Sequence, residues 1–303
     1  MFNFANKTIN MNIYPVAQVE SMTGIKAHTL RVWERRYQFL KPQRTETNIR
    51  FYTDSQLRKL INISILNRNG YRISKLDKMP DEEIHQKVSD ILNNADKTIE
   101  DDIQGLTLAM LEMDEEKFNI IYQAHIIRKG LLRTITEVIY PFLTHVGVLW
   151  ITNKAYPAQE HFITNLIRQK IISAIESYTK VPEDAPSIVL FLPDGENHEL
   201  GLLLSSFVAR YLGWKVYYLG QNVPREDIED VVDLVQPHAL MTMLLAPRKD
   251  TKELVNELLF SMKGKPFFIT GSPDIIKDLI QKKGVLFIRN PRELENKLNS
   301  IAH

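Results

Sequence analysis

Cysteine is absent from the 303-residue chain, which excludes disulfides, thiolate metal sites and cysteine nucleophiles. The sequence also lacks an uninterrupted apolar run of about 18 residues and a signal-peptide pattern at its start, so neither a membrane span nor export is expected. Glycine is scarce as well, with 12 residues in all. A hydrophobic content of 44% and a charged content of 25% are ordinary for a globular protein. We therefore expect a cytoplasmic protein of two or three domains.

The formal net charge of +1 conceals an uneven distribution of charge. Residues 1–76 contain 13 lysines and arginines against 4 aspartates and glutamates, whereas the remaining residues contain 25 against 33. Segregation on this scale predicts that the N-terminal part of the chain meets a polyanion.

The basic N-terminal part is predicted to contain two short helices separated by a tight turn. Pro15–Gly24 has the pattern of a helix that ends at a glycine, and Lys26–Tyr37 has that of a second helix. Such a pair is a helix-turn-helix. Asn48–Tyr52 predicts a small hairpin or wing, and Thr53 with Gln56 predicts a capping box that opens another helix.

Polar and cationic residues on the second of these helices could face a major groove and its phosphates. Those expected at the interface are Lys26, Thr29, Arg31 and Arg35. For any single arginine a solvated helix face is a reasonable alternative, but the charge excess and the motif coincide here.

The stretch from Thr29-Leu-Arg-Val-Trp-Glu-Arg-Arg-Tyr37 to Gly70 resembles the winged DNA-binding domain of the MerR family. The resemblance implies a winged helix-turn-helix domain over residues 12–78 that binds a double-stranded DNA operator. It implies DNA contacts from Arg31, Arg44, Arg50 and Tyr52, with Tyr52 packing the wing or touching a phosphate. Asn48-Ile49 stands where the family usually has a glycine, which leaves the turn type of the wing open.

Residues 80–180 are dominated by long amphipathic stretches, which predict a four-helix bundle. The expected helices span about 82–95, 98–112, 115–145 with a break near Gly130 or Pro141, and 157–178. Pro157 at a helix start would place Glu160 and His161 near the first turn.

From residue 186 to 303, apolar strand-like stretches alternate with helices. This alternation predicts a Rossmann-like parallel sheet covered on both faces. The expected strands lie near 187–193, 215–219, 238–245, 266–270 and 285–288, and Gly220–Pro224 is expected to be a strand-end loop.

Glu196-Asn-His-Glu-Leu-Gly201 lies where the first of these strands gives way to a helix. His198 thereby falls at the carboxyl end of a strand, where open α/β sheets bind ligands. A lone histidine there is more often a surface or capping residue, but Glu196 could accept its second N–H and fix its tautomer, as around a metal-bound histidine. Gly201 leaves room for a bulky group against the helix start.

Two further features lie at later strand ends at definite intervals. Thr242-Met-Leu244 is at the end of one strand, and Gly271-Ser272 directly follows another. Together the three stretches resemble the cobalamin-binding Rossmann-like (flavodoxin-like) domain, whose pattern is Asp-x-His-x-x-Gly, Ser-x-Leu and Gly-Gly. The resemblance implies that His198 is the lower axial ligand of cobalt, that Thr242 and Leu244 flank the nucleotide tail, and that Gly271 lies beside it. The departures are Glu196 for Asp, Thr242 for Ser and Ser272 for the second Gly.

Trp150, followed ten residues later by Glu160-His161, would by itself indicate a core tryptophan and an exposed polar pair. In this setting it resembles the bundle that caps cobalamin in light-sensing, adenosylcobalamin-dependent repressors of carotenoid genes. The resemblance implies that these three residues cover the upper face of the cofactor. Asn153 stands where that family often has Gly, and Ile151 offers cobalt no nitrogen.

Taken together, the resemblances imply a multidomain regulator without enzymatic activity, in which adenosylcobalamin, a cobalt corrinoid, controls operator binding and light changes the oligomer. A homo-oligomer, dimer or tetramer, is expected because most operators are two-fold symmetric. Two alternatives stay open at this point. One is a regulator that has lost cobalamin binding, and the other is a corrinoid methyltransferase module.

Overall fold

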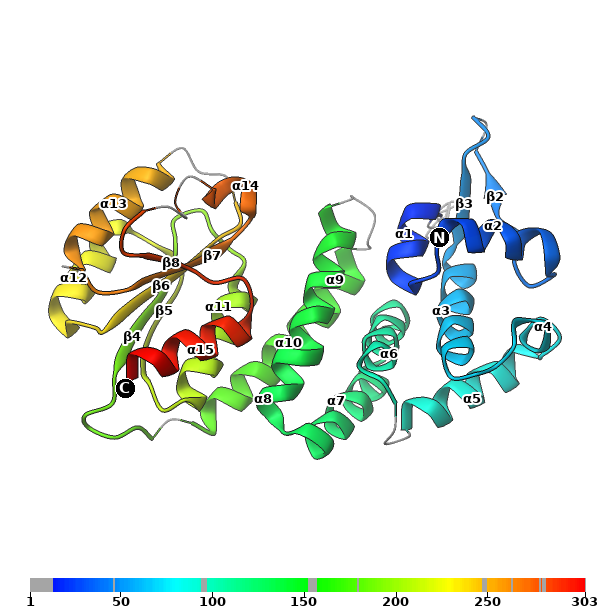
Figure 1. Cartoon of the computed structure of the whole chain (residues 1–303), viewed down its shortest axis with the longest axis horizontal. Helices are drawn as coiled ribbons and strands as arrows, with labels where there is room; N and C mark the ends of the chain where they lie inside the picture. The colour runs from blue at the N-terminus through cyan, green and yellow to red at the C-terminus, as the bar shows by residue number, and fades with distance from the viewer. Residues whose placement is uncertain are drawn as a thin grey trace, which may run out of the picture. The chain divides into compact units, whose positions relative to one another are not determined.

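The computed structural model describes residues 13–45, 47–93, 97–151, 157–178, 180–246, 250–262, 264–277, 279 and 282–302 (Figure 1). The chain divides into two compact units, Met1–Ile163 and Thr164–His303. The boundary predicted near residue 79 therefore lies inside the first unit, and the one predicted at 180–186 lies beyond the start of the second. The division into three domains stays a prediction.

The first unit holds the predicted winged helix-turn-helix and most of the helical bundle. Its elements are β1 (Ile13–Pro15), α1 (Val16–Thr23), α2 (Ala27–Arg36), β2 (Gln43–Arg44), β3 (Arg50–Thr53), α3 (Asp54–Arg68), α4 (Ile73–Leu76), α5 (Asp81–Asn93), α6 (Ile99–Glu112), α7 (Glu115–Lys129), α8 (Leu131–Arg133), the π-helix η1 (Thr134–Ile139), α9 (Tyr140–Ile151) and the start of α10 (Pro157–Glu176).

Helices α1 and α2 confirm the predicted helix-turn-helix. Helix α1 ends at Gly24, whose φ of 71° is left-handed, and the Gly24 amide donates to the Glu20 carbonyl. Leu30 and Trp33 form the buried side of α2. The capping box that Thr53 predicts at the start of α3 is also present. Local signals suffice for α1 and α3, because Gly24 ends the first and Thr53 starts the second.

The wing is a hairpin of β2 and β3, extended by β1 into an antiparallel sheet of order β1-β3-β2. Asn48 takes the left-handed conformation at its tip, with φ of 64°. Its amide donates to the Thr45 carbonyl at 2.8 Å. Asparagine tolerates this conformation better than other non-glycine residues, which explains how the chain turns without the glycine usual in the MerR family.

The long helical stretch predicted at 115–145 is interrupted at Gly130, where α7 ends. Pro141 does not break the chain's helical path, because it lies at the beginning of α9, directly after η1. The backbone is helical on both sides of Pro141, so the predicted break falls at Gly130.

The second unit is a parallel α/β fold. Its elements are the rest of α10, then β4 (Ser187–Pro193), α11 (Glu199–Tyr211), β5 (Lys215–Val223), α12 (Arg225–Val235), β6 (Ala239–Leu244), α13 (Thr251–Ser261), β7 (Phe267–Gly271), α14 (Pro273–Ile276), β8 (Val285–Phe287) and α15 (Pro291–Ala302). In the described residues the strands follow the order β5-β4-β6-β7-β8, and every neighbouring pair is parallel. This is the strand order of a flavodoxin-like fold, the fold class expected for this part of the chain.

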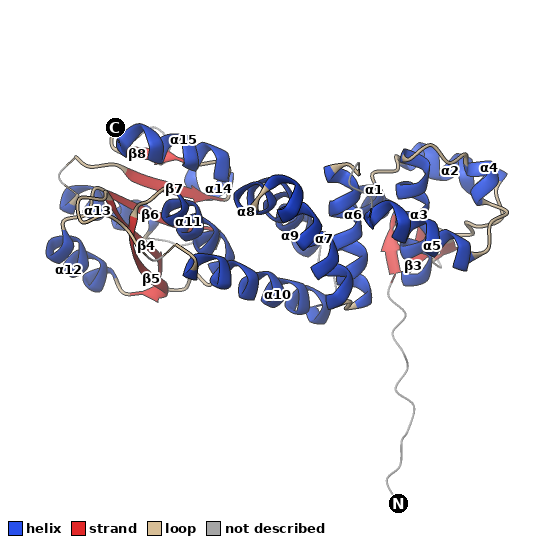
Figure 2. Cartoon of the chain, turned by 90° about the horizontal axis from the view of Figure 1, so that it is seen from below, coloured by secondary structure: helices blue, strands red, loops and turns tan. Residues whose placement is uncertain are grey.

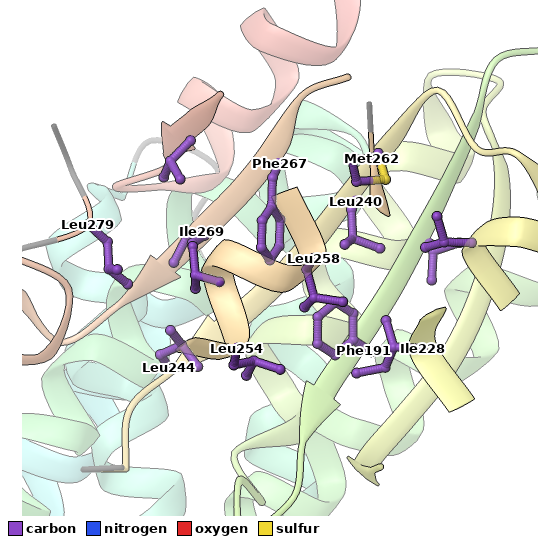
Figure 3. Close-up of a cluster of buried hydrophobic side chains, with 14 of the residues drawn as sticks. Phe191, Ile228, Leu240, Leu244, Leu254, Leu258, Met262, Phe267, Ile269 and Leu279 are labelled. Atoms are coloured by element: carbon purple, nitrogen blue, oxygen red, sulfur yellow. The ribbon is translucent and has the colours of Figure 1, made fainter. Parts of the chain in front are cut away.

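Helices cover both faces of this sheet (Figure 2). On one face α12 and α13 pack together over a continuous apolar core that includes Phe191, Leu240, Leu258 and Phe267 (Figure 3). Helices α11 and α15 pack against each other on the other face. Burial from both faces explains why all seven residues of β4 are buried.

One sequence prediction about the sheet is wrong. Gly220–Pro224, expected to be a strand-end loop, instead continues β5 as far as Val223. The pairing of β4 with β5 shifts register after Leu190 and again after Phe191. Such irregularities let an edge strand extend while it bends.

Gly271 pairs with Leu244 at the end of β6, and a Cβ there would lie 2.1 Å from the Leu244 carbonyl oxygen. We expect Gly271→Ala to lower the free energy of unfolding by about 1–3 kcal/mol, because β6 and β7 must separate. Chemical denaturation measures the change. Gly147→Ala is the control, since nothing lies within 4 Å of a Cβ at that position. Equal stabilities of the two variants would contradict the expected contact.

Within the described ranges, no helix has both the length and the apolar character needed to cross a bilayer.

Candidate functional site

His198 lies between the end of β4 and the first residue of α11, in the N-cap position of that helix. Its side chain is 60% exposed, and its Nδ1 is hydrogen-bonded to Oε1 of Glu196. Because Nδ1 faces the carboxylate, Nε2 is the nitrogen with which the ring can reach a metal. The pairing expected from the sequence is thus present.

Glu196 is the buried anchor of this histidine, with 1% of its surface exposed. Its Oε2 accepts the backbone N–H groups of Leu245 and Ala246, both at 2.7 Å. Its Oε1 also accepts the backbone N–H of His198 at 3.1 Å. One side chain therefore ties the β4–α11 loop to the residues that follow β6.

Burial alone would raise the pKa of Glu196. Hydrogen bonds from the His198 imidazole and from the backbone amides of Ala246, Leu245 and His198 outweigh burial and lower the pKa to about 2. Glu196 is consequently ionised at neutral pH. Its negative charge holds a proton on Nδ1 of His198 and leaves Nε2 to act as a ligand.

Asn222 supports the same loop from β5, a role that the sequence did not indicate. Its Oδ1 accepts the Gly195 amide at 2.9 Å, and its Nδ2 donates to Oδ1 of Asn197 at 2.6 Å. Its φ of 56° is left-handed. The strand extension that corrected the loop prediction thus places a side chain against the histidine loop.

Gly201 is closely approached by another residue that sequence reasoning missed. A Cβ at Gly201 would lie 1.9 Å from Cε of Met243, so the thioether lies over the glycine. Side chains alternate along a strand, which puts Met243 on the opposite face of β6 from Thr242 and Leu244. In the sequence, the only indication of this contact was that Met243 lies between the two predicted ligand residues, Thr242 and Leu244.

The remaining predicted ligand contacts lie nearby on the carboxyl edge of the sheet. Thr242 is 1% exposed and donates to the Phe191 carbonyl at 3.0 Å. Leu244 belongs to the apolar core, and Gly271 pairs with it. The structure brings the three motifs together, while the contacts of Thr242, Leu244 and Gly271 with a ligand stay predictions.

The side chains at this edge of the sheet fit a cobalt corrinoid better than a bare metal ion. A bare ion needs three or four protein ligands, and the described residues hold no group of three or more histidine, aspartate or glutamate side chains suited to one. A cobalt corrinoid carries its own equatorial nitrogens, so a single protein side chain is enough to provide a ligand for the cobalt. The supported imidazole of His198 can supply that ligand.

The predicted upper-face residues belong to α9 and α10. Trp150 lies in α9, and its side chain falls outside the described residues, as does all of Asn153. In the first turns of α10, His161 is 66% exposed and its Nδ1 lies 3.2 Å from Oε2 of Glu160. Gln159 beside them donates to the Leu111 carbonyl at 2.8 Å, which fixes the start of α10 on α6.

In the helix-turn-helix, Lys26, Arg31, Arg35 and Arg44 are exposed, and Thr29 is half-buried. Arg44 donates to the carbonyl and side-chain oxygens of Asn48, at 3.3 and 2.7 Å, and so closes the wing tip. The exposed cations on α2 are placed as a DNA-binding helix requires, and their contacts with DNA stay predictions.

Tyr52 is a correction to the predicted DNA contacts. Its side chain is completely buried, and its hydroxyl donates to Oε1 of Glu34 at 2.6 Å. Burial raises the pKa of Tyr52 well above its usual range, and the neighbouring Glu34 adds to the shift. Of the two expected roles, the structure supports packing of the wing. Arg50 lies 3.1 Å from Oε2 of the same glutamate, which neutralises part of its charge.

Comparison with known proteins finds two matching families. Residues 14–83 match the MerR HTH family of regulatory proteins, and residues 102–173 match the B12 binding domain. The HTH-type transcriptional repressor CarH of Myxococcus xanthus is 25% identical over 88% of this chain and 90% of its own length. The repressor CarA of the same organism is 25% identical over 77% of each chain.

Among solved structures, the monomethylamine corrinoid protein of Methanosarcina barkeri has a TM-score of 0.54 and 15% sequence identity. The match covers 67% of this chain and all of that protein, and it shows a shared fold. The chain therefore combines a MerR-type helix-turn-helix domain with a B12 binding domain.

Proposed function

We propose that the protein is a light-responsive transcriptional regulator in which adenosylcobalamin sets the affinity for an operator. The observation that carries this proposal is the His198–Glu196 pair at the carboxyl edge of a flavodoxin-like sheet, in a chain that also has a MerR-type head. The names of the CarH and CarA repressors support a transcriptional role and favour repression.

Adenosylcobalamin supplies a weak cobalt–carbon bond that light can break. The residues of the chain hold and orient the cofactor. His198 would bind cobalt through Nε2, and the buried carboxylate of Glu196 would fix the ring by holding the proton on Nδ1. Asn222 keeps the loop in position from β5.

Trp150, Glu160 and His161 are proposed to cover the upper face of the cofactor, as the resemblance implies. Glu160 can accept hydrogen bonds from ribose hydroxyls. Contacts of these three side chains with the bound cofactor would favour a dimer or tetramer, and a chain without these contacts would favour a smaller species. Operator binding would follow the assembly, because a two-fold operator needs two heads.

A corrinoid methyltransferase module is the second candidate, and the fold shared with the corrinoid protein is what favours it. That likeness concerns the fold alone, and function depends on the site. A MerR-type head has no role in methyl transfer. We therefore favour regulation over catalysis.

The test is an absorbance spectrum of the full chain after incubation with adenosylcobalamin in the dark, desalting and illumination, with size-exclusion elution before and after. We expect retained corrin bands that change with light, together with a smaller particle after illumination. If the corrin bands are retained but neither the spectrum nor the particle size changes with light, the signal is chemical rather than light. A colourless protein would contradict cobalamin binding, and turnover of a methyl donor would favour the enzyme.

A further inference from the structure

Helix α6 begins with polar side chains that are buried. Asp101 and Asp102 are completely buried, and Gln104 is 6% exposed. Buried charges and amides are costly unless other groups satisfy them. The partners of these three residues lie on different elements of the first unit, and they link the bundle to the helix-turn-helix.

Asp102 connects α6 to its neighbours in the bundle. Its Oδ1 lies 2.8 Å from Nζ of Lys97, which is itself fully buried. Its Oδ2 accepts a hydrogen bond from Arg128 of α7, also at 2.8 Å, and Arg128 donates to the Lys97 carbonyl as well. The first turn of α6 is therefore tied to the end of α7, next to the break at Gly130 and the π-helix.

Asp101 connects the same turn to α3, the helix that follows the wing. Its Oδ1 lies 3.1 Å from Nη1 of Arg68, and its Oδ2 accepts from Nδ2 of Asn69 at 3.3 Å. Asp101 also completes the capping box of Thr98. The carboxylate is thus shared between the start of α6 and the end of α3.

Gln104 reaches the helix-turn-helix itself. Its Nε2 donates to the Thr23 carbonyl at 2.9 Å and to Oγ of Ser64 at 3.3 Å. Ser64 Oγ donates to the same carbonyl at 2.7 Å. Thr23 is the last residue of α1, and only three residues separate it from α2. The bundle therefore holds the carbonyl at which the turn toward the DNA-binding helix begins.

We infer that Gln104 is a positioning residue for DNA recognition, which fixes α2 through the Thr23 carbonyl and carries movements of the bundle to the turn. The part concerning ligand-driven movement rests on the proposed function, whereas the positioning role does not. A hydrogen bond weakens steeply when its geometry is disturbed, and Oε1 of Gln104 is buried without a hydrogen-bond partner among the described residues. Such a contact can be released by a small displacement of α6.

The variant that isolates this role is Gln104→Met, which keeps the shape and removes both the donor and the unpartnered carbonyl. If Gln104 only stabilised the fold, the variant would lose sequence-specific and non-specific DNA binding to a similar extent. A positioning role predicts loss of sequence-specific binding only, because non-specific affinity comes from phosphate contacts that tolerate misalignment. Gln123→Met on the exposed side of α7 is the matched control.

The experiment uses the full chain and a duplex selected by the wild-type protein from a random library, with random-sequence duplex of equal length as the non-specific probe. We expect Gln104→Met to bind the selected duplex about 10-fold more weakly, as for one lost base contact, and random duplex within about two-fold of wild type. Equal losses on both probes, or no loss on either, would overturn the inference.

Amide hydrogen exchange gives a readout that needs no operator. We expect residues 24–36 to exchange at least about five-fold faster in Gln104→Met than in the Gln123→Met control. Unchanged exchange there would overturn the inference. If Gln104→Met does not fold, Ser64→Ala removes the other donor to the Thr23 carbonyl and should give the same selective changes.

Adding adenosylcobalamin to the same binding assay separates this inference from the proposed function. A wild-type affinity that does not respond to the cofactor contradicts the proposed function and leaves the positioning result intact. If adenosylcobalamin changes the DNA affinity of the wild type, we expect this change to be at least about five-fold smaller in Gln104→Met, because the coupling between the two sites is lost. An equally large change in affinity in Gln104→Met would contradict a coupling through Gln104 on α6.

Discussion

Replacing His198 by alanine is expected to weaken adenosylcobalamin binding by at least about 100-fold. Loss of an outer-shell partner alone typically costs 10- to 100-fold in metal affinity, and here the axial ligand itself is lost. The exposed imidazole is positioned by a carboxylate whose other oxygen is fixed by two backbone amides. Equilibrium dialysis in the dark gives the affinity, and the absorbance spectrum reports whether a histidine nitrogen binds cobalt.

Two further variants make this result specific. Glu196→Gln keeps the size of the side chain but removes its charge, so we expect a smaller loss of about 10-fold. His85→Ala removes an exposed imidazole on α5 and should leave the affinity unchanged. Normal binding and normal light response of His198→Ala would contradict the assigned ligand. Equal losses in all three variants would indicate a general loss of structure.

The parts of the fold that sequence predicted well are those set by local or repetitive signals. Residues 188–193 are apolar throughout, as expected for a strand that is covered on both faces, and such a run can be recognised in the sequence without knowing which helices cover it. The capping box at Thr53 and the left-handed Gly24 are equally local. The histidine loop was found because Glu196 and His198 are two residues apart and meet directly.

Contacts between distant parts of the chain could not be predicted in this way. Glu196 reaches amides 49 and 50 residues away, and Gln104 reaches a carbonyl 81 residues away. Neither pairing leaves a periodic or local trace. The Met243 thioether over Gly201 is similar, because a glycine signals open space but does not say which side chain uses it.

Tyr52 shows the opposite case, in which a motif suggested two roles and packing decided between them. An aromatic residue on a wing can face DNA or the core. Its partner Glu34 lies on α2, eighteen residues earlier, and is shared with Arg50. The same glutamate therefore removes one predicted contact from the DNA interface and partly neutralises another. The exposed cations of α2 remain as the principal candidates.

Replacing Arg31 and Arg35 together by alanine is accordingly expected to abolish most DNA binding. Both side chains are exposed on α2, and Arg35 Nε donates to the Arg31 carbonyl one turn earlier, which directs the two cations along one side of the helix. If each contacts a phosphate, the slope of log K against log salt concentration should fall by about 2. At about 0.15 M salt we expect an affinity loss of roughly 30-fold, since a slope of about −0.9 per contact corresponds to roughly five-fold per contact relative to about 1 M salt.

Fluorescence anisotropy with a selected duplex, repeated at several salt concentrations, measures both quantities. Lys129→Ala removes an exposed cation at the end of α7 and should change neither the affinity nor the slope. If the double arginine variant changes neither the affinity nor the slope, the phosphates are contacted by other residues of the winged helix-turn-helix. A fall in affinity without a change in slope would assign these arginines to base edges, because base contacts carry specificity and release few counterions.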